Sequence, residues 1–418
     1  MEAAFPITLT AFAYLSNVVT SVTNAYVITK ESETNGWHLD GAWRWGHGKY
    51  VELPLQTATQ SDERLWVEAT INRRPVQLAI DTGVSGMVLF PKAAARLGLS
   101  IRKSAEDAGV DLEHIVEGTA EECEIRLFRT NFTMNLPVLK VPAQLNSDLD
   151  GLVGWSQLGS GILRIDACLG TVTWLANLPP DITNWTRLEI DTNSSVLRLE
   201  AAGWQPSPFI IPVDTGSPHG VTLCTNLWQE WRASHSNEPM TLSAFFMPLA
   251  GLEIAQEAWA NSLAVGPLML KSVPVESPTK GDATFGGTGW QATLGLAALK
   301  RLEIVLDCER GIAYLRGRET PAAPYEHNRL GAEFVPVDFQ SDELIAHVVE
   351  GSPAWDAGVR NGDVLLRIGR SDATKWRTNP ELLGFNSRPA GTKLKLTLRR
   401  GETMFKAHVV LREILSDN

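Results

Sequence analysis

The fold is decided by two similar stretches, Val76-Gln-Leu-Ala-Ile-Asp81-Thr82-Gly83 and Phe209-Ile-Ile-Pro-Val-Asp214-Thr215-Gly216. In each stretch an apolar run, typical of a buried strand, ends in Asp-Thr-Gly. Glycine permits a tight turn and a close approach of chains, and a threonine hydroxyl can hydrogen-bond to backbone across the turn. We therefore expect Asp81 and Asp214 to lie where two equivalent strands leave their sheets.

Two further landmarks recur in the same order. Asp150-Gly-Leu-Val-Gly154 returns as Gln291-Ala-Thr-Leu-Gly295, and Leu163-Arg-Ile-Asp166 returns as Ile304-Val-Leu-Asp307. The three landmarks are separated by 133, 141 and 141 residues, which indicates a duplicated unit with the length of a small domain. Solenoid repeats are much shorter, roughly 20–50 residues.

The duplication divides the chain. We predict an N-terminal segment at residues 1–49, two copies of one β unit at 50–186 (lobe 1) and 187–317 (lobe 2), and a separate module at 325–414 (the C-terminal unit). The two lobes are expected to pack as an internal pseudo-dimer within a monomer. The residues between lobe 2 and the module include Pro321 and Pro324 among small and polar residues, which is typical of a linker.

Short strands bounded by turn residues indicate a mainly β fold. Leu65–Ile71 alternates apolar and polar residues, and Val76–Ile80 follows it after a turn. Helical patterns are scarce and short, with candidates at Ala93–Leu97 and Asn226–Ser234.

Composition excludes several classes of function. Hydrophobic residues make up 44% and charged residues 20% of the 418 residues, which are globular values. The net charge of −11 is carried by residues 1–320, because acidic and basic side chains balance in 321–418. Neither part has the basic patch of a nucleic-acid-binding protein. The four cysteines form no C-x-x-C motif, and their spacing leaves one or two disulfides open.

Two aspartates brought together by a duplication form a reactive pair. A two-fold axis relating the copies places Asp81 and Asp214 face to face. Two carboxylates a few ångströms apart share a proton, because both cannot easily be ionised. One can then take a proton from a water molecule while the other donates to a carbonyl oxygen. This chemistry needs no metal and no cofactor, and the eight histidines show no metal-ligand spacing.

These motifs resemble those of a known protein family. Residues 50–317 look like a single-chain aspartic protease of the retropepsin/pepsin type, most similar to the bacterial retropepsin-like group. The resemblance implies polypeptide substrates, a catalytic pair Asp81 and Asp214, and an apolar-apolar-Gly segment that crosses behind each catalytic loop in a ψ shape. It also implies that the two loops are locked and supported by the residues after each aspartate, namely Thr82, Gly83, Thr215 and Gly216.

One departure concerns the flap that covers the substrate in pepsin-like enzymes. No Tyr or Trp occurs between Val84 and Asp150, so a pepsin-type flap tyrosine is missing. We place the first flap within Ser100–Glu122 and a longer, more apolar second flap within Ala244–Glu257. The alternative is a non-catalytic peptide-binding or scaffold protein that retains both folds, that of the protease lobes and that of the C-terminal unit.

Other residues are given structural roles. Asp166 and Asp307 each begin Asp-x-x-x-Gly after a strand, which predicts hairpin turns. His219 lies too close in sequence to Asp214 and Ser217 to form a hydrolase triad, and the first repeat has no matching histidine. The glycine-rich segment 281–289 lacks the phosphate-binding Gly-Lys-Ser/Thr sequence and is read as a loop. Cys168 and Cys308 are expected to be half-buried core thiols.

The C-terminal unit carries a different pattern. Ser352, Pro353 and Gly358 mark the start and end of a short helix, and strands are expected at 364–368, 393–399 and 405–411, with a second helix starting near Asn379-Pro380. The segment Ser352–Ile368 resembles the PDZ domains associated with bacterial proteases.

That resemblance implies a bound peptide carboxyl terminus at Leu330, Gly331 and Phe334, and a role in substrate selection or regulation. A purely structural role is the alternative, and Pro336 removes one donor from the expected edge strand. Because both Asp-Thr-Gly motifs precede the linker, we expect the lobes to be catalytically complete without this unit.

The N-terminus resembles an export signal. Residues 3–15 are almost all apolar, and Thr23-Asn24-Ala25 fits a small-x-small cleavage site. We expect an exported chain, periplasmic or secreted, that starts near Tyr26; the missing basic n-region leaves a cytoplasmic location open. No stretch reaches the ~18 uninterrupted apolar residues of a membrane helix, so no stable membrane span is expected.

Overall fold

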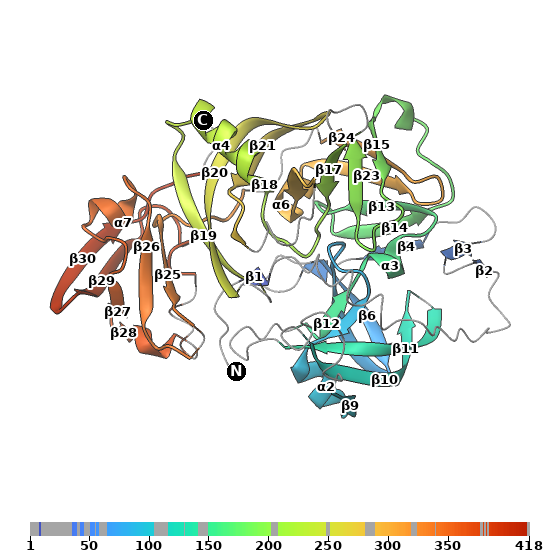
Figure 1. Cartoon of the computed structure of the whole chain (residues 1–418), viewed down its shortest axis with the longest axis horizontal. Coiled ribbons are helices and arrows are strands. Elements are labelled where there is room, and N and C mark those ends of the chain that lie inside the picture. Colours follow the sequence, from blue (N-terminus) through green and yellow to red (C-terminus); the bar gives the residue numbers. More distant parts are fainter. Residues whose placement is uncertain are drawn as a thin grey trace.

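A computed structural model gives the structure of the chain. It describes residues 65–103, 116–128, 130–140, 149–201, 208–247, 251–280, 289–318, 324–338, 340–376, 379, 382 and 384–415, together with the backbone of five short strands before residue 58. The expected cleavage site, most of the first flap, most of segment 281–289 and the start of the second C-terminal helix lie outside these residues. The described chain is mainly β with few short helices, as predicted (Figure 1).

Lobe 1 is a closed barrel. Its wall runs β6 (Leu65–Ile71), β7 (Arg74–Ile80), β12 (Gly151–Val153), β8 (Met87–Leu89), β11 (Thr130–Leu139) and β10 (Val116–Leu127), and β10 pairs back with β6 to close it. β9 (Ile101–Arg102) adds to β10 outside this ring. Closure leaves few free edges and encloses the apolar residues that alternate along each strand. The predicted helix is α2 (Pro91–Leu97), which begins at a proline and ends at Gly98 in the left-handed conformation.

Lobe 2 repeats this arrangement with an open sheet. Its strands run β1 (Thr8–Leu9), β19 (Met240–Met247), β20 (Gly251–Val265), β21 (Leu268–Glu276), β18 (Val221–Leu223) and β22 (Ala292–Leu294). The other predicted helix is α4 (Thr225–Ser234). β19 and β20 form a long hairpin at the position proposed for the second flap. No helix of the described residues combines the length and the hydropathy that a membrane crossing needs.

A third sheet joins the lobes. Its strands run β17 (Phe209–Pro212), β16 (Arg198–Ala201), β15 (Thr186–Ile190), β24 (Ile312–Gly317), β23 (Leu302–Asp307), β13 (Ile162–Asp166), β14 (Thr171–Leu175) and β4 (Val51–Pro54). The repeated segments form its central pair, where Ile162 lies opposite Asp307 and Ile165 opposite Ile304. The duplicated landmarks therefore meet at the centre of the molecule.

The two hairpins at this sheet confirm the turn prediction. Asp166 accepts a hydrogen bond from the Leu169 N–H at 2.9 Å, and Asp307 accepts one from the Arg310 N–H at 3.1 Å. The prediction for Cys168 is wrong, because this residue lies in the first turn and its side chain is exposed, whereas Cys308 is half-buried against the core as expected. All four cysteines are free thiols.

The C-terminal unit has its own sheet and its own apolar core. The sheet runs β25 (Ala332–Pro336), β26 (Leu344–Val348), β27 (Val364–Ile368), β29 (Lys393–Arg400) and β30 (Thr403–Val410), with β28 (Ser371–Asp372) beside β27. Trp376 is fully buried in this core. The Ser352 hydroxyl caps α7 (Pro353–Asp356) by accepting the Trp355 N–H at 3.2 Å, as the sequence predicted.

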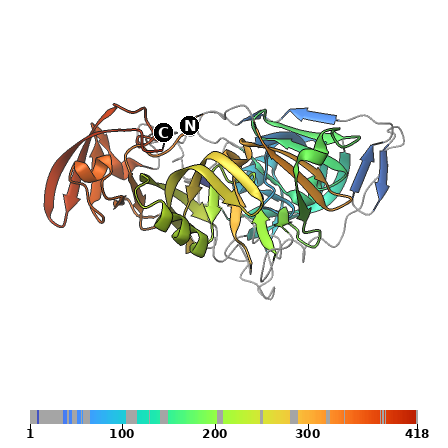
Figure 2. The same cartoon turned by 90° about the horizontal axis from the view of Figure 1, so that it is seen from above.

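The unit is attached to lobe 2 more closely than a flexible linker implies. β25 lies beside β19 (Figure 1), and the view from above shows the C-terminal unit next to lobe 2 (Figure 2). The Thr241 hydroxyl on β19 donates to the Asn328 carbonyl at 2.5 Å, and the Asn328 amide donates to the Leu242 carbonyl at 3.1 Å. Residues just after the linker therefore belong to an interface with lobe 2.

Candidate active site

The two Asp-Thr-Gly loops occupy equivalent places in the lobes. The Asp81 N–H donates to the Val153 carbonyl at 3.0 Å, and the Asp214 N–H donates to the Leu294 carbonyl at 2.9 Å. In lobe 1, β12 lies between β7, to which it is parallel, and β8, to which it is antiparallel. In lobe 2, β22 pairs with β18 and is bridged in parallel to Val213. Each apolar-apolar-Gly segment thus crosses behind its loop, as expected from the motif.

Four hydrogen bonds made by Thr82 and Thr215 lock the two loops together. The Thr82 hydroxyl donates to the Val213 carbonyl at 2.6 Å and accepts the Thr215 N–H at 3.1 Å. In the mirror arrangement, the Thr215 hydroxyl donates to the Ile80 carbonyl at 2.8 Å and accepts the Thr82 N–H at 3.0 Å. Both threonines are fully buried. We call this set of bonds the threonine clamp.

The clamp brings the two aspartates together across the lobe boundary. Asp81 is 2% exposed and Asp214 is 3% exposed. The Gly83 N–H donates to Asp81 Oδ1 at 3.0 Å, and the Gly216 N–H donates to Asp214 Oδ1 at 2.8 Å. Each carboxyl group also lies against the glycine of the opposite loop.

The glycines are required by this close approach. A Cβ added to Gly216 would lie 2.2 Å from Asp81 Oδ2, and one added to Gly83 would lie 3.0 Å from the Asp214 carboxyl carbon. Any side chain at Gly216 would therefore displace a carboxylate. The structure places all six residues predicted for this site in one buried group: Asp81, Thr82, Gly83, Asp214, Thr215 and Gly216.

This geometry suits chemistry that depends on a shared proton. Each carboxyl group is held by a backbone N–H donor of its own loop and lies against the glycine of the opposite loop. Close carboxylates in a buried site titrate as a pair, with one proton retained over a wide pH range. Such a pair can act as base toward water and as acid toward a carbonyl oxygen.

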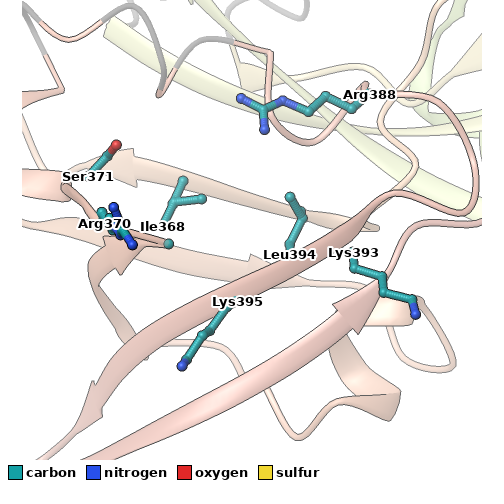
Figure 3. Close-up of a pocket in the computed structure, with 8 residues that line it drawn as sticks. Ile368, Arg370, Ser371, Arg388, Lys393, Leu394 and Lys395 are labelled. Carbon is teal, nitrogen blue, oxygen red and sulfur yellow. The ribbon is translucent and has the colours of Figure 1, made fainter.

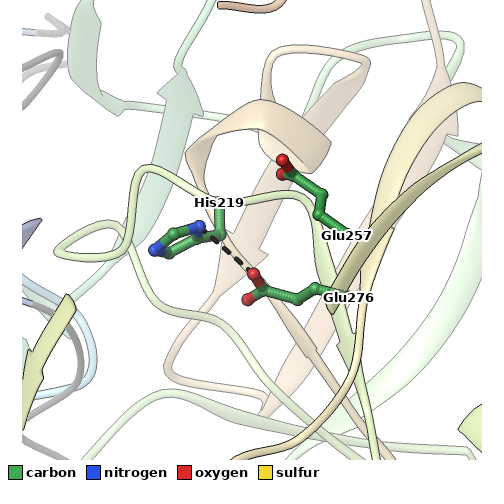
Figure 4. A group of neighbouring side chains, drawn as sticks. All are labelled: His219, Glu257 and Glu276. Carbon is green, nitrogen blue, oxygen red and sulfur yellow. Dashed lines mark ion pairs between the residues drawn. The ribbon is translucent and has the colours of Figure 1, made fainter. Parts of the chain in front are cut away.

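Sequence reasoning missed a second group of polar residues near this site. His219, Glu257 and Glu276 are 5%, 2% and 3% exposed and come from the second loop, β20 and β21 (Figure 4). Their side chains are of the types that hold metal ions, and among the described residues they form the one such group, with candidate atoms within 4.8 Å of one another. Glu276 already contacts His219 directly, Oε2 to Nδ1 at 3.2 Å. The two glutamates lie far along the chain from the motif, so no local pattern marks them.

The residues predicted to bind a peptide in the C-terminal unit have partners within the chain. The N–H groups of Leu330 and Gly331 both donate to Asn328 Oδ1 at 3.0 Å. The side chains of Leu330 and Phe334 are buried in the core, where Phe334 packs against Phe385. A peptide carboxylate at this loop would have to displace the Asn328 side chain.

A shallow pocket of about 350 Å³ lies elsewhere on the C-terminal unit (Figure 3). Four of its lining residues are cationic: Arg370, Arg388, Lys393 and Lys395. Lys393 and Lys395 alternate with the buried Leu394 along β29 and are exposed, so they point to the opposite face of the strand. Because the cations do not converge, the pocket is not a defined anion site.

A comparison with known protein families found a match within lobe 1. A family model described as aspartyl protease matches residues 67–156. The match includes the first Asp-Thr-Gly motif and the apolar-apolar-Gly segment that crosses behind it, and it ends before lobe 2. No curated protein sequence matches the chain.

The threonine clamp predicts an unequal effect of two small substitutions. Thr82→Val leaves the Val213 carbonyl and the Thr215 N–H buried without their partner, which should lower the free energy of unfolding by about 2–4 kcal/mol. Thr82→Ser keeps the hydroxyl and should remain close to the parent protein. Urea denaturation of both variants measures this difference; equal stability of the valine and serine variants would contradict the clamp.

Proposed function

We propose that the two lobes form the active site of an aspartic endopeptidase, with Asp81 and Asp214 as the catalytic pair. The main support for this proposal is the threonine clamp, which aligns two buried aspartates from separate lobes. The aspartyl protease family matched by lobe 1 suggests peptide hydrolysis. The extension to lobe 2 rests on the repeated motif and on the equivalent hydrogen bonds in the two loops.

The proposed reaction uses one proton shared by the pair. The ionised carboxylate takes a proton from a water molecule, and the water oxygen attacks the peptide carbonyl carbon. The protonated carboxyl group donates its proton to the carbonyl oxygen as the tetrahedral intermediate forms. Transfer of a proton to the amide nitrogen then allows the C–N bond to break, which yields a carboxylic acid and an amine and restores one proton to the pair.

We further propose that the C-terminal unit at 325–414 is a PDZ-like peptide-binding module. Its support is the capped helix at Ser352, the edge strand β25 and the loop at Leu330 and Gly331. Addition of a peptide strand beside an edge is a common mode of recognition. Asn328 competes for the loop donors, so binding should be weak and coupled to the interface with lobe 2.

The catalytic pair predicts activity below neutral pH that depends on both aspartates. On a denatured protein substrate, Asp81→Asn and Asp214→Asn should each lower the rate by more than about 10³-fold, because a neutral amide cannot share the proton. A chelator should leave the rate unchanged. Cleavage is measured by electrophoresis and mass spectrometry across pH 3–8.

The controls separate catalysis from folding. Both asparagine variants should keep the thermal unfolding of the parent protein, because an amide oxygen can still accept the Gly83 or Gly216 N–H. Robust cleavage by either variant would refute the proposed pair. Binding of peptides without any cleavage by the parent protein would instead favour the non-catalytic alternative.

The PDZ-like module predicts recognition of a free carboxyl terminus. A fluorescent peptide with a free terminus should bind the full chain more tightly than the same peptide with an amidated terminus, since only the former offers a carboxylate to the loop N–H groups. Fluorescence anisotropy measures both. Equal binding of the two peptides would show that the loop at Gly331 does not read the terminus.

We also propose export, on the strength of the apolar run at residues 3–15. N-terminal sequencing of the protein from its native host should then give a mature chain that begins near Tyr26 and lacks β1, which among the described strands pairs only with the edge strand β19. An intact Met1 on protein from the cytoplasmic fraction would refute export.

A further inference from the structure

A cluster of four buried side chains and one half-buried side chain, Tyr325, lies between the second Asp-Thr-Gly loop and the C-terminal unit. Its members, which we call the lobe 2 cluster, are His219, Thr222, Glu257, Glu276 and Tyr325. Figure 4 shows His219 and both glutamates turned toward one another from three different segments. The cluster has no role in the proposed chemistry of the aspartates, so its position calls for another explanation.

Hydrogen bonds, one ion-pair contact and one pair of neighbouring residues link the members of the cluster. Glu276 contacts His219 through Oε2 and accepts the Thr222 hydroxyl through Oε1 at 2.5 Å. Glu257 accepts the Tyr325 hydroxyl through Oε1, also at 2.5 Å. Glu257 and Glu276 are direct neighbours across β20 and β21, a position in which two ionised carboxylates repel each other.

One end of the cluster holds the second catalytic loop. The Ser217 N–H donates to Asp214 Oδ1 at 3.2 Å, and two residues later His219 enters the cluster. The carbonyls of Ser217 and His219 accept the N–H groups of Leu296 and Ala297 at 2.7 and 2.9 Å. The backbone of the loop is therefore fixed on one side, and the His219 ring fixes the end that follows Asp214.

The other end is held by the C-terminal unit. His327 Nδ1 lies 3.2 Å from the Tyr325 carbonyl, and His327 Nε2 accepts the N–H groups of Ile414 and Leu415 at 3.3 and 3.1 Å. Burial lowers the pKa of His327, which favours the neutral ring that can accept these bonds. The end of the chain thus positions the residue that closes the cluster.

Lobe 1 provides an internal comparison. Strand register and loop hydrogen bonds define the equivalent positions of His219, Thr222, Glu257 and Glu276, which in lobe 1 hold Ser85, Val88, Thr119 and Pro137. None of these four ionises in the ordinary pH range. The barrel architecture therefore does not require buried charges at these positions. Lobe 2, which contacts the C-terminal unit, has them.

We propose that the lobe 2 cluster positions the second Asp-Thr-Gly loop, that a proton held on Glu257 keeps it intact, and that Tyr325 makes the activity of the lobes depend on the C-terminal unit. This proposal builds on the aspartic protease function. It replaces the expectation that the lobes are catalytically complete before the linker. His219, Glu257, Glu276 and Tyr325 act through the loop backbone and are positioning residues.

The electrostatics of the cluster support a retained proton. Burial, and then the charge of Glu276, raise the pKa of Glu257 to about 7, while Tyr325 and His219 lower it. Burial, and to a smaller extent Glu257, raise the pKa of Glu333 on β25 to about 8. An ordinary glutamate has a pKa of 4.5. The unfolded chain releases these protons at lower pH than the folded chain, so stability falls as pH rises from about 4.5 through 7 and 8.

The first test measures stability and does not depend on catalysis. The full chain should have a lower melting temperature at pH 8 than at pH 5. Glu257→Gln cannot ionise and should reduce this difference by somewhat less than half, since Glu333 has the larger pKa shift and still contributes. Glu230→Gln, at an exposed position on α4 in the same lobe, is the matched control and should keep the full difference.

The second test measures cleavage of a short peptide against pH. Tyr325→Phe removes only a hydroxyl and should lower kcat by roughly three- to tenfold with little change in KM. Glu257→Gln should extend activity toward higher pH, because the side chain at position 257 can then no longer ionise as the pH rises. Tyr314→Phe on β24 is the control for loss of a tyrosine hydroxyl and should match the parent protein.

Three results would overturn the proposal. The first is a difference in melting temperature between pH 5 and pH 8 that is the same in the parent protein and in Glu257→Gln. Another is unchanged kcat and an unchanged pH profile in both cluster variants of an active enzyme. The third is a rise in melting temperature on adding Zn²⁺ that Glu257→Gln abolishes, which would make the cluster a metal site. An inactive parent protein would refute the proposed function, while the melting experiment would still decide the role of the cluster.

Discussion

Reciprocal hydrogen bonds of Thr82 and Thr215 hold the two lobes together at their centre. Each hydroxyl donates to a carbonyl of the opposite strand end and accepts an N–H of the opposite loop. Because all four partners are buried backbone groups or hydroxyls, separation of the lobes would leave them unsatisfied. The clamp thereby fixes the aspartates that precede the threonines, and it makes the two lobes one structural unit together with the central pair β13 and β23.

The duplication has kept the backbone and changed its polar content. Equivalent strands surround both loops, yet the positions around the lobe 1 loop hold residues that do not ionise, whereas lobe 2 holds His219 and two glutamates. Burying unpaired charge is costly, so such groups persist where partners satisfy them. In lobe 2 those partners include Tyr325, which lies outside the duplicated unit. The lobe with the buried ionisable groups is the lobe that contacts the C-terminal unit.

The features that could be predicted from the sequence are those that a few neighbouring residues specify, above all where the same motif occurs twice. Asp-Thr-Gly, the apolar-Gly segments and the Ser352 helix cap each specify their own geometry within a few residues, and the structure has them as predicted. The sequence did not predict the lobe 2 cluster, because Glu257 and Glu276 are 19 residues apart in two strands. The register that pairs these strands cannot be read from their composition. The contact between β19 and Asn328 was not predicted for the same reason. Cys168 was misplaced because a turn residue can follow a buried strand directly and still face solvent.

A common proton requirement links the aspartate pair and Glu257. The proposed reaction uses one proton between the two aspartates, and Glu257 is neutral only below a pKa of about 7. Protonation of acidic side chains at low pH also reduces the net charge of −11 that residues 1–320 carry. Raising the pH therefore adds charge at Glu257, at Glu333 on β25 and over the lobe surface. The proposed activity is therefore expected in an acidic range for two reasons, the stability of the folded chain and the proton shared by the aspartates.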